Sequence, residues 1–156
     1  MEVVTQHYFH SSLTGMGYVV LGAWLIQATV GVTLLVSWAR HAHGQSAGLV
    51  WTHAVAMVGF LVPWSAFVVT GAALWAWVGF GVLLVFIGFG DATMVRRART
   101  VLGETNPGLR DYVPAALVAL SGRLGRRTTF HMLFSAVVFF GALAVAIGAT
   151  VAAAAS

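Results

Sequence analysis

The sequence contains no cysteine and no lysine, and only 8% of its 156 residues are charged. A chain without cysteine cannot form disulfides, thiolate metal sites, iron–sulfur clusters or thioether bonds to haem. Soluble proteins carry about 25% charged residues, so little of this chain's surface can face water. A hydrophobic fraction of 60% and a mean hydropathy of +0.91 therefore predict an integral, multi-pass membrane protein, with residues 1–156 forming a single membrane domain.

Several chemistry-bearing patterns are also missing. The sequence has no nucleophile motif, no phosphate-binding loop and no metalloprotease helix. No lysine or central carboxylate of the kind that marks proton-coupled transport lies within an apolar run. These absences disfavour hydrolases and pumps.

Four apolar runs are long enough to cross a hydrocarbon core about 30 Å thick, which takes about 20 helical residues. They cover about 13–38, 47–70, 72–90 and 130–151. Pro63 predicts a kink in the second run about one turn before Thr70, and Gln27 in the first run is expected to hydrogen-bond to another helix. The predicted fold class is all-α, an integral membrane four-helix bundle with up-and-down topology.

The connection at residues 91–128 is the only extended polar part of the sequence. Within it, Asp111 to Gly122 is predicted to form a short helix, with Asp111 near the N-cap, Pro114 in the first turn and Gly122 at the end. This helix is apolar and flanked by arginines, so we expect it to lie in the membrane interface.

Arginine is confined to one side of the predicted bundle. Arg40 lies between the first two runs, and seven arginines lie between the third and fourth: Arg96, Arg97, Arg99, Arg110, Arg123, Arg126 and Arg127. Positively charged loops stay in the cytoplasm, so both termini are expected outside. The all-arginine, alanine-rich composition favours the bacterial inner (plasma) membrane. The basic residues flank membrane runs, so the expected partner is the lipid bilayer and not nucleic acid.

Two histidines stand at the beginnings of apolar runs, His53 in the second and His131 in the fourth. In an up-and-down bundle these two helices are diagonal partners that run in the same direction. Their imidazoles should therefore face each other at matched depth, which is a geometry for holding haem b between two axial ligands. A structural or interfacial role for both histidines is the alternative, and a histidine at a membrane boundary taken by itself favours that role.

Haem propionates pair well with guanidinium groups, so four nearby arginines are candidate haem contacts: Arg96, Arg97, Arg126 and Arg127. Asp91 is expected at the level of the histidines. It either orients a ligand histidine by hydrogen bonding or pairs with Arg96 or Arg97, and we favour the pairing.

His7 and His10 are three residues apart near the N-terminus and would share a face if the first helix begins that early. Such a pair can hold a metal ion, copper included, or a second haem. Glu2 is the only acidic residue near them in the sequence. His7 and His10 therefore indicate a metal site more weakly than His53 and His131 indicate a haem site.

Three features carry a family resemblance: the histidine-led run from Phe130 to Leu143, His10 ahead of the first run, and Arg96–Arg97 closing the third. With them the chain resembles small four-helix membrane proteins related to the copper-resistance D and bacterial membrane protoporphyrinogen oxidase families. The resemblance implies haem or copper at membrane histidines, with His10, His53 and His131 as the matching positions. The oxidase type relies on a lysine, which this chain lacks, so that activity is not implied.

The first functional hypothesis is a b-type membrane cytochrome, an oxidoreductase subunit that exchanges electrons with a quinone or a partner redox protein. The alternative is a cofactor-free accessory or assembly subunit of a larger membrane complex. A copper or small-solute permease that uses His7 and His10 is the third hypothesis.

Overall fold

The computed structural model describes residues 2–42, 44, 46–103 and 112–155, and describes side chains from residue 12 onward. All regular secondary structure in these residues is helical, which confirms the predicted all-α class. The helices are α1 (Glu2–His41), α2 (Ala47–Gly59), α3 (Leu61–Thr70), α4 (Ala73–Leu102), α5 (Tyr112–Leu120) and α6 (Arg126–Ala154).

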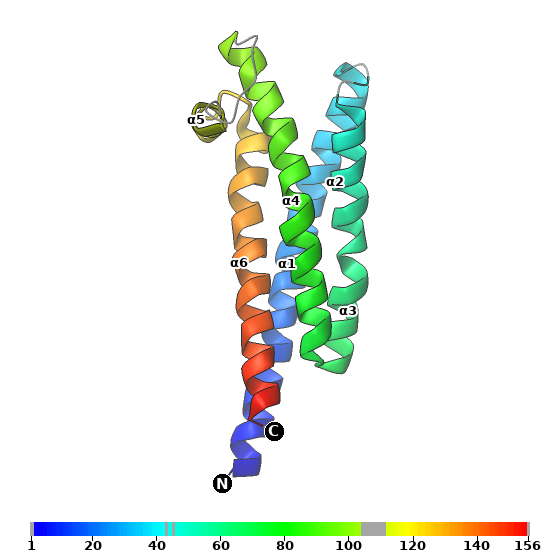
Figure 1. Cartoon of the computed structure of the whole chain (residues 1–156), viewed down its shortest axis with the longest axis vertical. Coiled ribbons are helices and arrows are strands. Elements are labelled where there is room, and N and C mark those ends of the chain that lie inside the picture. Colours follow the sequence, from blue (N-terminus) through cyan, green and yellow to red (C-terminus); the bar gives the residue numbers. More distant parts are fainter. Residues whose placement is uncertain (1, 43, 45, 104–111, 156) are drawn as a thin grey trace.

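The long helices stand side by side, and α2 and α3 follow each other as one interrupted rod (Figure 1). Around the bundle, α1 packs on α6, α6 on α4, α4 on α2 and α3, and α3 on α1. Consecutive rods are therefore neighbours, as in an up-and-down bundle. The α2–α3 rod is diagonal to α6, and α1 is diagonal to α4. Both ends of the chain lie at the same end of the bundle.

Four segments are long and apolar enough to cross a membrane: Ser12–His41, Ala47–Thr70, Ala73–Leu102 and Arg126–Ala154. The shortest has 24 residues, which corresponds to about 36 Å of helix at 1.5 Å per residue. Large apolar side chains such as Val55, Val69, Leu84 and Phe140 are exposed on the outer faces. Such a surface is matched to lipid and not to water.

The helices extend beyond the predicted spans. Residues 91–102 are the last three turns of α4, so the helix continues into the polar connection at residues 91–128. Charged residues mark where a helix leaves the hydrocarbon and not where it stops. The end comes at Gly103, which has a positive φ of 73° and caps α4. Likewise, α1 begins at Glu2 and α6 at Arg126, ahead of the predicted starts.

The interruption of the second span lies at Phe60, between α2 and α3. Pro63 has no N–H to donate to the carbonyl of Gly59, and its ring crowds that carbonyl. The hydrogen bonds on either side persist, from Phe60 N to Ala56 O at 2.9 Å and from Trp64 N to Phe60 O at 3.1 Å. The effect of Pro63 therefore falls nearer the middle of the span than the sequence suggests.

A core of large aromatic residues holds the half of the bundle nearest the termini. The side chains of Phe60 and Trp64 are completely buried, and their rings stack at a centroid distance of 5.1 Å. The indole nitrogen of Trp64 donates to the backbone carbonyl of Gly17 on α1 at 3.0 Å. This contact ties the α2–α3 rod to α1.

Helix α5 lies across the far end of the bundle and is seen end-on in Figure 1. Its buried residues Ala115, Val118 and Ala119 pack with Val95 and Ala98 of α4 in a small second core. It begins at Tyr112, close to the predicted start; the expected cap Asp111 lies outside the described residues.

Candidate functional site

The two histidines predicted to face each other lie together in the bundle interior. The ring centroids of His53 and His131 are 6.4 Å apart, and the ring planes are inclined at 79°. His53 lies six residues into α2 and His131 five residues into α6. At 1.5 Å per residue, the pair is about 8–9 Å below the starts of these helices. Each imidazole therefore sits in the second turn of its helix.

The position of His53 is defined by α4. Its Nδ1 lies 3.2 Å from the backbone carbonyl oxygen of Phe86. In the tautomer that donates this hydrogen bond, Nε2 carries a free lone pair and can bind a metal. One turn further along α4, a Cβ at position 90 would lie only 2.8 Å from Cε1 of His53. Gly90 therefore allows the ring to lie directly on the α4 backbone.

The position of His131 is defined by α1. Gln27 Nε2 donates to the backbone carbonyl of His131 at 2.6 Å. One turn later, a Cβ at position 31 would lie 3.2 Å from Cε1 of His131 and 3.9 Å from its Nδ1. Gly31 thus allows the His131 ring to lie against the α1 backbone, as Gly90 allows the His53 ring to lie against the α4 backbone.

Two polar atoms at this site are buried and unpaired among the described residues: Gln27 Oε1 and His131 Nδ1. Buried polar groups are nearly always hydrogen-bonded, and leaving one unpaired costs about 1–3 kcal/mol. Both atoms belong to residues already joined by the Gln27–His131 contact. An additional group at this position, such as a water or a ligand, would satisfy them.

The site is shared by all four rods at one level. One diagonal pair supplies the imidazoles of His53 and His131, and the other supplies Gly31 and Gly90. An imidazole nitrogen binds a metal at about 2.0–2.1 Å and lies about 1.1 Å from its ring centre, so two imidazoles on opposite sides of one metal place their centroids about 6.3 Å apart. The observed 6.4 Å matches this value, and it also lies within the range of about 4.5–7 Å for an ordinary pair of packed rings.

The number of ligands distinguishes between metals. In the described part of the chain, no three His, Cys, Asp or Glu side chains gather as a metal site. Zinc in proteins usually takes three or four protein ligands. Haem iron needs only axial ligands from the protein, because the macrocycle supplies the rest. Two imidazoles alone are thus too few for a zinc site of the usual kind, whereas they match the number of axial ligands that a haem takes.

The four candidate propionate arginines lie on the same side of the histidines. Arg96 and Arg97 are exposed and follow Gly90 by about two turns of α4. Arg96 Nη1 donates to Ser46 Oγ at 3.3 Å, which joins the end of α4 to the start of α2. Arg126 and Arg127 are exposed in the first turn of α6. All four are placed beyond the site toward one end of the bundle, and their role as haem contacts stays a prediction.

Asp91 has a partner that the sequence did not suggest. Its Oδ2 accepts a hydrogen bond from the Tyr112 hydroxyl of α5 at 3.1 Å. Burial, and then the nearby charge of Asp91, raise the pKa of Tyr112. Among the described residues Asp91 forms neither the favoured ion pair with Arg96 or Arg97 nor a hydrogen bond to a histidine, so both expectations are wrong. Since α4 continues as a helix, residues five and six positions beyond Asp91 point away from it.

His7 and His10 belong to the backbone of α1, but their side chains lie outside the described ones. The structure therefore adds nothing to the prediction of a metal site there.

Three residues of the site did not appear among the sequence candidates. Gln27 was expected to bond to another helix, and it does, but its acceptor is a backbone carbonyl. Gly31 and Gly90 were missed altogether. The available signal was that each is an isolated glycine inside an apolar run, a position that often marks a close approach.

The fold and the site together define an all-helical chain with four candidate membrane spans and a pair of half-buried histidines between diagonal helices. No protein-family model, no curated protein and no solved structure matches the chain. Its function is therefore inferred from the residues of the site.

Proposed function

We propose that the chain is a b-type membrane cytochrome in which His53 and His131 are the axial ligands of one haem b. The observation that carries the proposal is the 6.4 Å separation of the two imidazoles across the bundle diagonal. When bound, the haem supplies an iron centre that takes up and gives up one electron at a time. The chain then serves as an oxidoreductase subunit between a quinone or a redox protein and another redox centre.

The surrounding residues have separate tasks in this proposal. The Phe86 carbonyl holds the Nδ1 proton of His53, which leaves Nε2 for the iron. Gln27 holds the backbone of α6 at His131. Gly31 and Gly90 keep the flanking helices free of side chains at the level of the rings. The chain itself thus orients both ligands and excludes bulk water from them.

The four arginines near the ends of α4 and α6 are proposed to face the haem propionates: Arg96, Arg97, Arg126 and Arg127. They are exposed and lie on one side of the histidines, so a carboxylate reaching out of the bundle would meet guanidinium groups and water. The same haem chemistry is what the resemblance to the copper-resistance D and protoporphyrinogen oxidase families implies.

The proposed orientation places the arginine-bearing end in the cytoplasm of a bacterial inner membrane, with both termini outside. The described arginines, which exclude Arg110, all lie near the ends of helices or in loops at that end: Arg40, Arg96, Arg97, Arg99, Arg123, Arg126 and Arg127. Gly90 lies 17 residues from the start of α4 at Ala73, or about 26 Å. A haem at this level would lie near the cytoplasmic edge of the hydrocarbon.

The test is an absorption spectrum of protein purified in detergent from cells with ample haem, recorded oxidised and then reduced with dithionite. We expect a Soret band, visible bands that sharpen on reduction, and about one iron per chain by metal analysis. His53→Ala and His131→Ala should each lose the six-coordinate spectrum. His41→Ala is the matched control, since His41 is exposed and bonds only to the Ser37 carbonyl of its own helix, at 2.8 Å.

A colourless protein without iron, still helical by circular dichroism, would refute the proposal. Co-purification of that colourless chain with other membrane subunits would favour the accessory-subunit alternative. Copper in place of iron, lost in the same two variants, would favour a copper site.

A further inference from the structure

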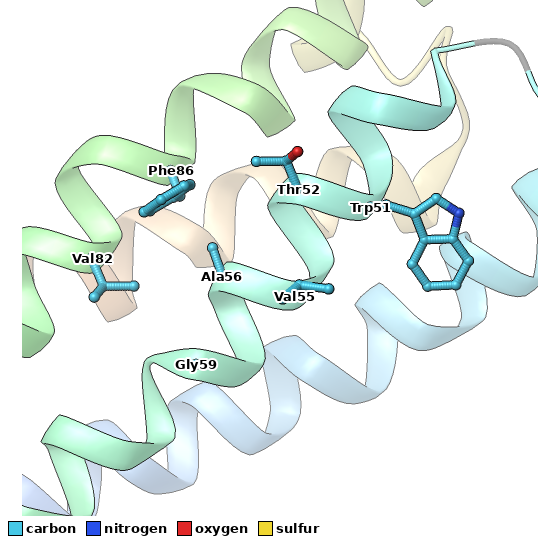
Figure 2. Close-up of a pocket in the computed structure, with 7 residues that line it drawn as sticks. All are labelled: Trp51, Thr52, Val55, Ala56, Gly59, Val82 and Phe86. Atoms are coloured by element: carbon cyan, nitrogen blue, oxygen red, sulfur yellow. The ribbon is translucent and has the colours of Figure 1, made fainter.

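An open groove runs along the outer surface between α2 and α4, next to the histidine pair. It has a volume of about 580 Å³, and its lining includes Trp51, Thr52, Ala56, Gly59, Val82 and Phe86 (Figure 2). From Trp51 to Gly59 it descends eight residues, or about 12 Å, from the arginine-bearing end into the apolar zone. The groove is therefore open both to the headgroup level and to the lipid tails.

The groove is connected to the site through two of its lining residues. Thr52 immediately precedes His53, and the backbone carbonyl of Phe86 is the partner of His53 Nδ1. A molecule in the groove would therefore contact one residue that is next to His53 in the chain and one whose backbone contacts the His53 ring.

Thr52 has a hydroxyl group without a partner among the described residues. In an apolar helix a threonine hydroxyl usually bonds to the carbonyl three or four residues earlier. Seven other helical threonines here do so: Thr29, Thr33, Thr70, Thr93, Thr100, Thr129 and Thr150. Figure 2 shows the Thr52 side chain directed toward α4 across the groove. Its O–H is free to donate to a ligand.

The walls of the groove suit a flat ring with an apolar tail. Phe86 projects from α4 toward α2 (Figure 2), so a planar ring in the groove can contact an aromatic surface there; the Trp51 indole extends from the other side of α2. Below them Ala56 and Gly59 on α2 and Val82 on α4 form a smooth apolar channel. A phospholipid acyl chain would fill the channel but would use neither the Thr52 hydroxyl nor the flat face of Phe86.

We propose that this groove binds a lipid-soluble quinone, with a ring carbonyl accepting a hydrogen bond from Thr52 and the isoprenoid tail following Ala56 and Gly59. The proposal deepens the cytochrome function and rests on it for the electron transfer, though not for the binding. A quinol releases two electrons and two protons, whereas one haem iron takes one electron on going from Fe(III) to Fe(II). One quinol therefore reduces the haems of two chains, and both protons leave to water.

The test is a titration of the protein in nanodiscs with a short-tailed ubiquinone analogue, followed by quenching of tryptophan fluorescence. We expect saturable quenching in the wild type. Thr52→Val keeps the side-chain shape without the hydroxyl and should weaken binding about tenfold, the effect of one lost hydrogen bond. Ala56→Leu should fill the channel and abolish saturation. Ser65→Ala, which changes an exposed hydroxyl of α3 away from the groove, should bind as the wild type does.

Quenching that rises linearly in the wild type would overturn the proposal and leave lipid chains as the occupant. So would quenching in Thr52→Val and Ala56→Leu that is unchanged from the wild type. Because quenching needs no haem, the result is independent of the spectrum. In protein that carries haem, half an equivalent of the quinol should reduce the iron fully, and Thr52→Val should slow that reduction while dithionite still reduces it at once. If the protein carries haem but does not bind the quinone, only the quinone site is refuted. If it binds the quinone but carries no haem, only the cytochrome function is refuted.

Discussion

Gly90→Ala is the substitution that tests the packing of the site most directly. The added Cβ would lie 2.8 Å from Cε1 of His53, 3.1 Å from Nδ1 and 3.2 Å from Nε2. Ordinary contact begins at 3.4 Å, so the ring must withdraw by at least 0.6 Å, the difference between 3.4 and 2.8 Å. Withdrawal from α4 also stretches the 3.2 Å contact between Nδ1 and the Phe86 carbonyl, which is already at the long end for a hydrogen bond.

The magnitude follows from two losses. Inserting a methyl group into a filled site costs about 1–3 kcal/mol, and the lost hydrogen bond costs about 1 kcal/mol more. Replacing glycine by alanine within a helix also brings a gain of about 1 kcal/mol. Gly88→Ala provides the matched control, because it lies on the same helix and a Cβ there meets nothing within 4 Å. The helix gain cancels between the two variants, so their free energies of unfolding should differ by about 2–4 kcal/mol.

The assay compares the two variants by thermal unfolding in one detergent and by haem content after purification. We expect Gly90→Ala to unfold at a lower temperature than Gly88→Ala and to retain less haem, since the His53 ring is displaced. Equal unfolding temperatures and equal haem content would show that His53 does not lie against the α4 backbone, and the site described above would then be incorrect.

Three further predictions concern other contacts. Gln27→Leu should lower the free energy of unfolding by about 1–3 kcal/mol through loss of the bond to the His131 carbonyl, whereas Thr29→Val on the exposed face of α1 should change it by less than about 1 kcal/mol; equal effects in thermal unfolding would contradict this. Asp91→Asn should lower the pKa of Tyr112 part of the way toward its ordinary value of 10.0, because burial, the larger cause, remains. The pKa of Tyr112 is measured from tyrosinate absorbance against pH, with Tyr112→Phe as the blank. A pKa that Asp91→Asn leaves unchanged would exclude the hydrogen bond between Tyr112 and Asp91. Since the pKa is raised in the folded state, Tyr112 contributes stability that is complete below about pH 10 and is lost as the pH rises through the higher folded pKa. Alkaline phosphatase fused after Ser156 should be active and a fusion after Leu102 inactive, if the arginine-bearing end is cytoplasmic; the opposite pattern would reverse the orientation.

The sequence was sufficient for the features that depend on position along the bundle axis. Hydropathy marks which helical segments are apolar enough to cross a hydrocarbon core, so the four candidate spans follow from it. In an up-and-down bundle the even-numbered spans begin at the same end. Two histidines near the beginnings of those spans must then share a level, and His53 and His131 do.

The features that depend on rotation about a helix axis could not be predicted in this way. Every apolar helix here has hydrophobic residues on all sides, so the pattern does not say which side faces the bundle. Whether Gln27 reaches α4 or α6, and whether Gly90 faces the bundle or the lipid, is decided by packing. The partner of Asp91 could not be predicted either, because it depends on how α5 packs across the end of the bundle. That packing places the Tyr112 hydroxyl next to Asp91.

The glycines explain how two histidines can be held so close within a bundle of ordinary helices. The His53 ring lies against the backbone of α4 and the His131 ring against that of α1, and a side chain at either point of contact would push the ring back toward its own helix. Gly90 removes that obstacle for His53 and Gly31 for His131, at a cost of about 1 kcal/mol each in helix propensity. Two positions at one level carry this cost, and each lets one imidazole lie inside the bundle against a neighbouring helix. The cytochrome proposed above would use that placement of both rings.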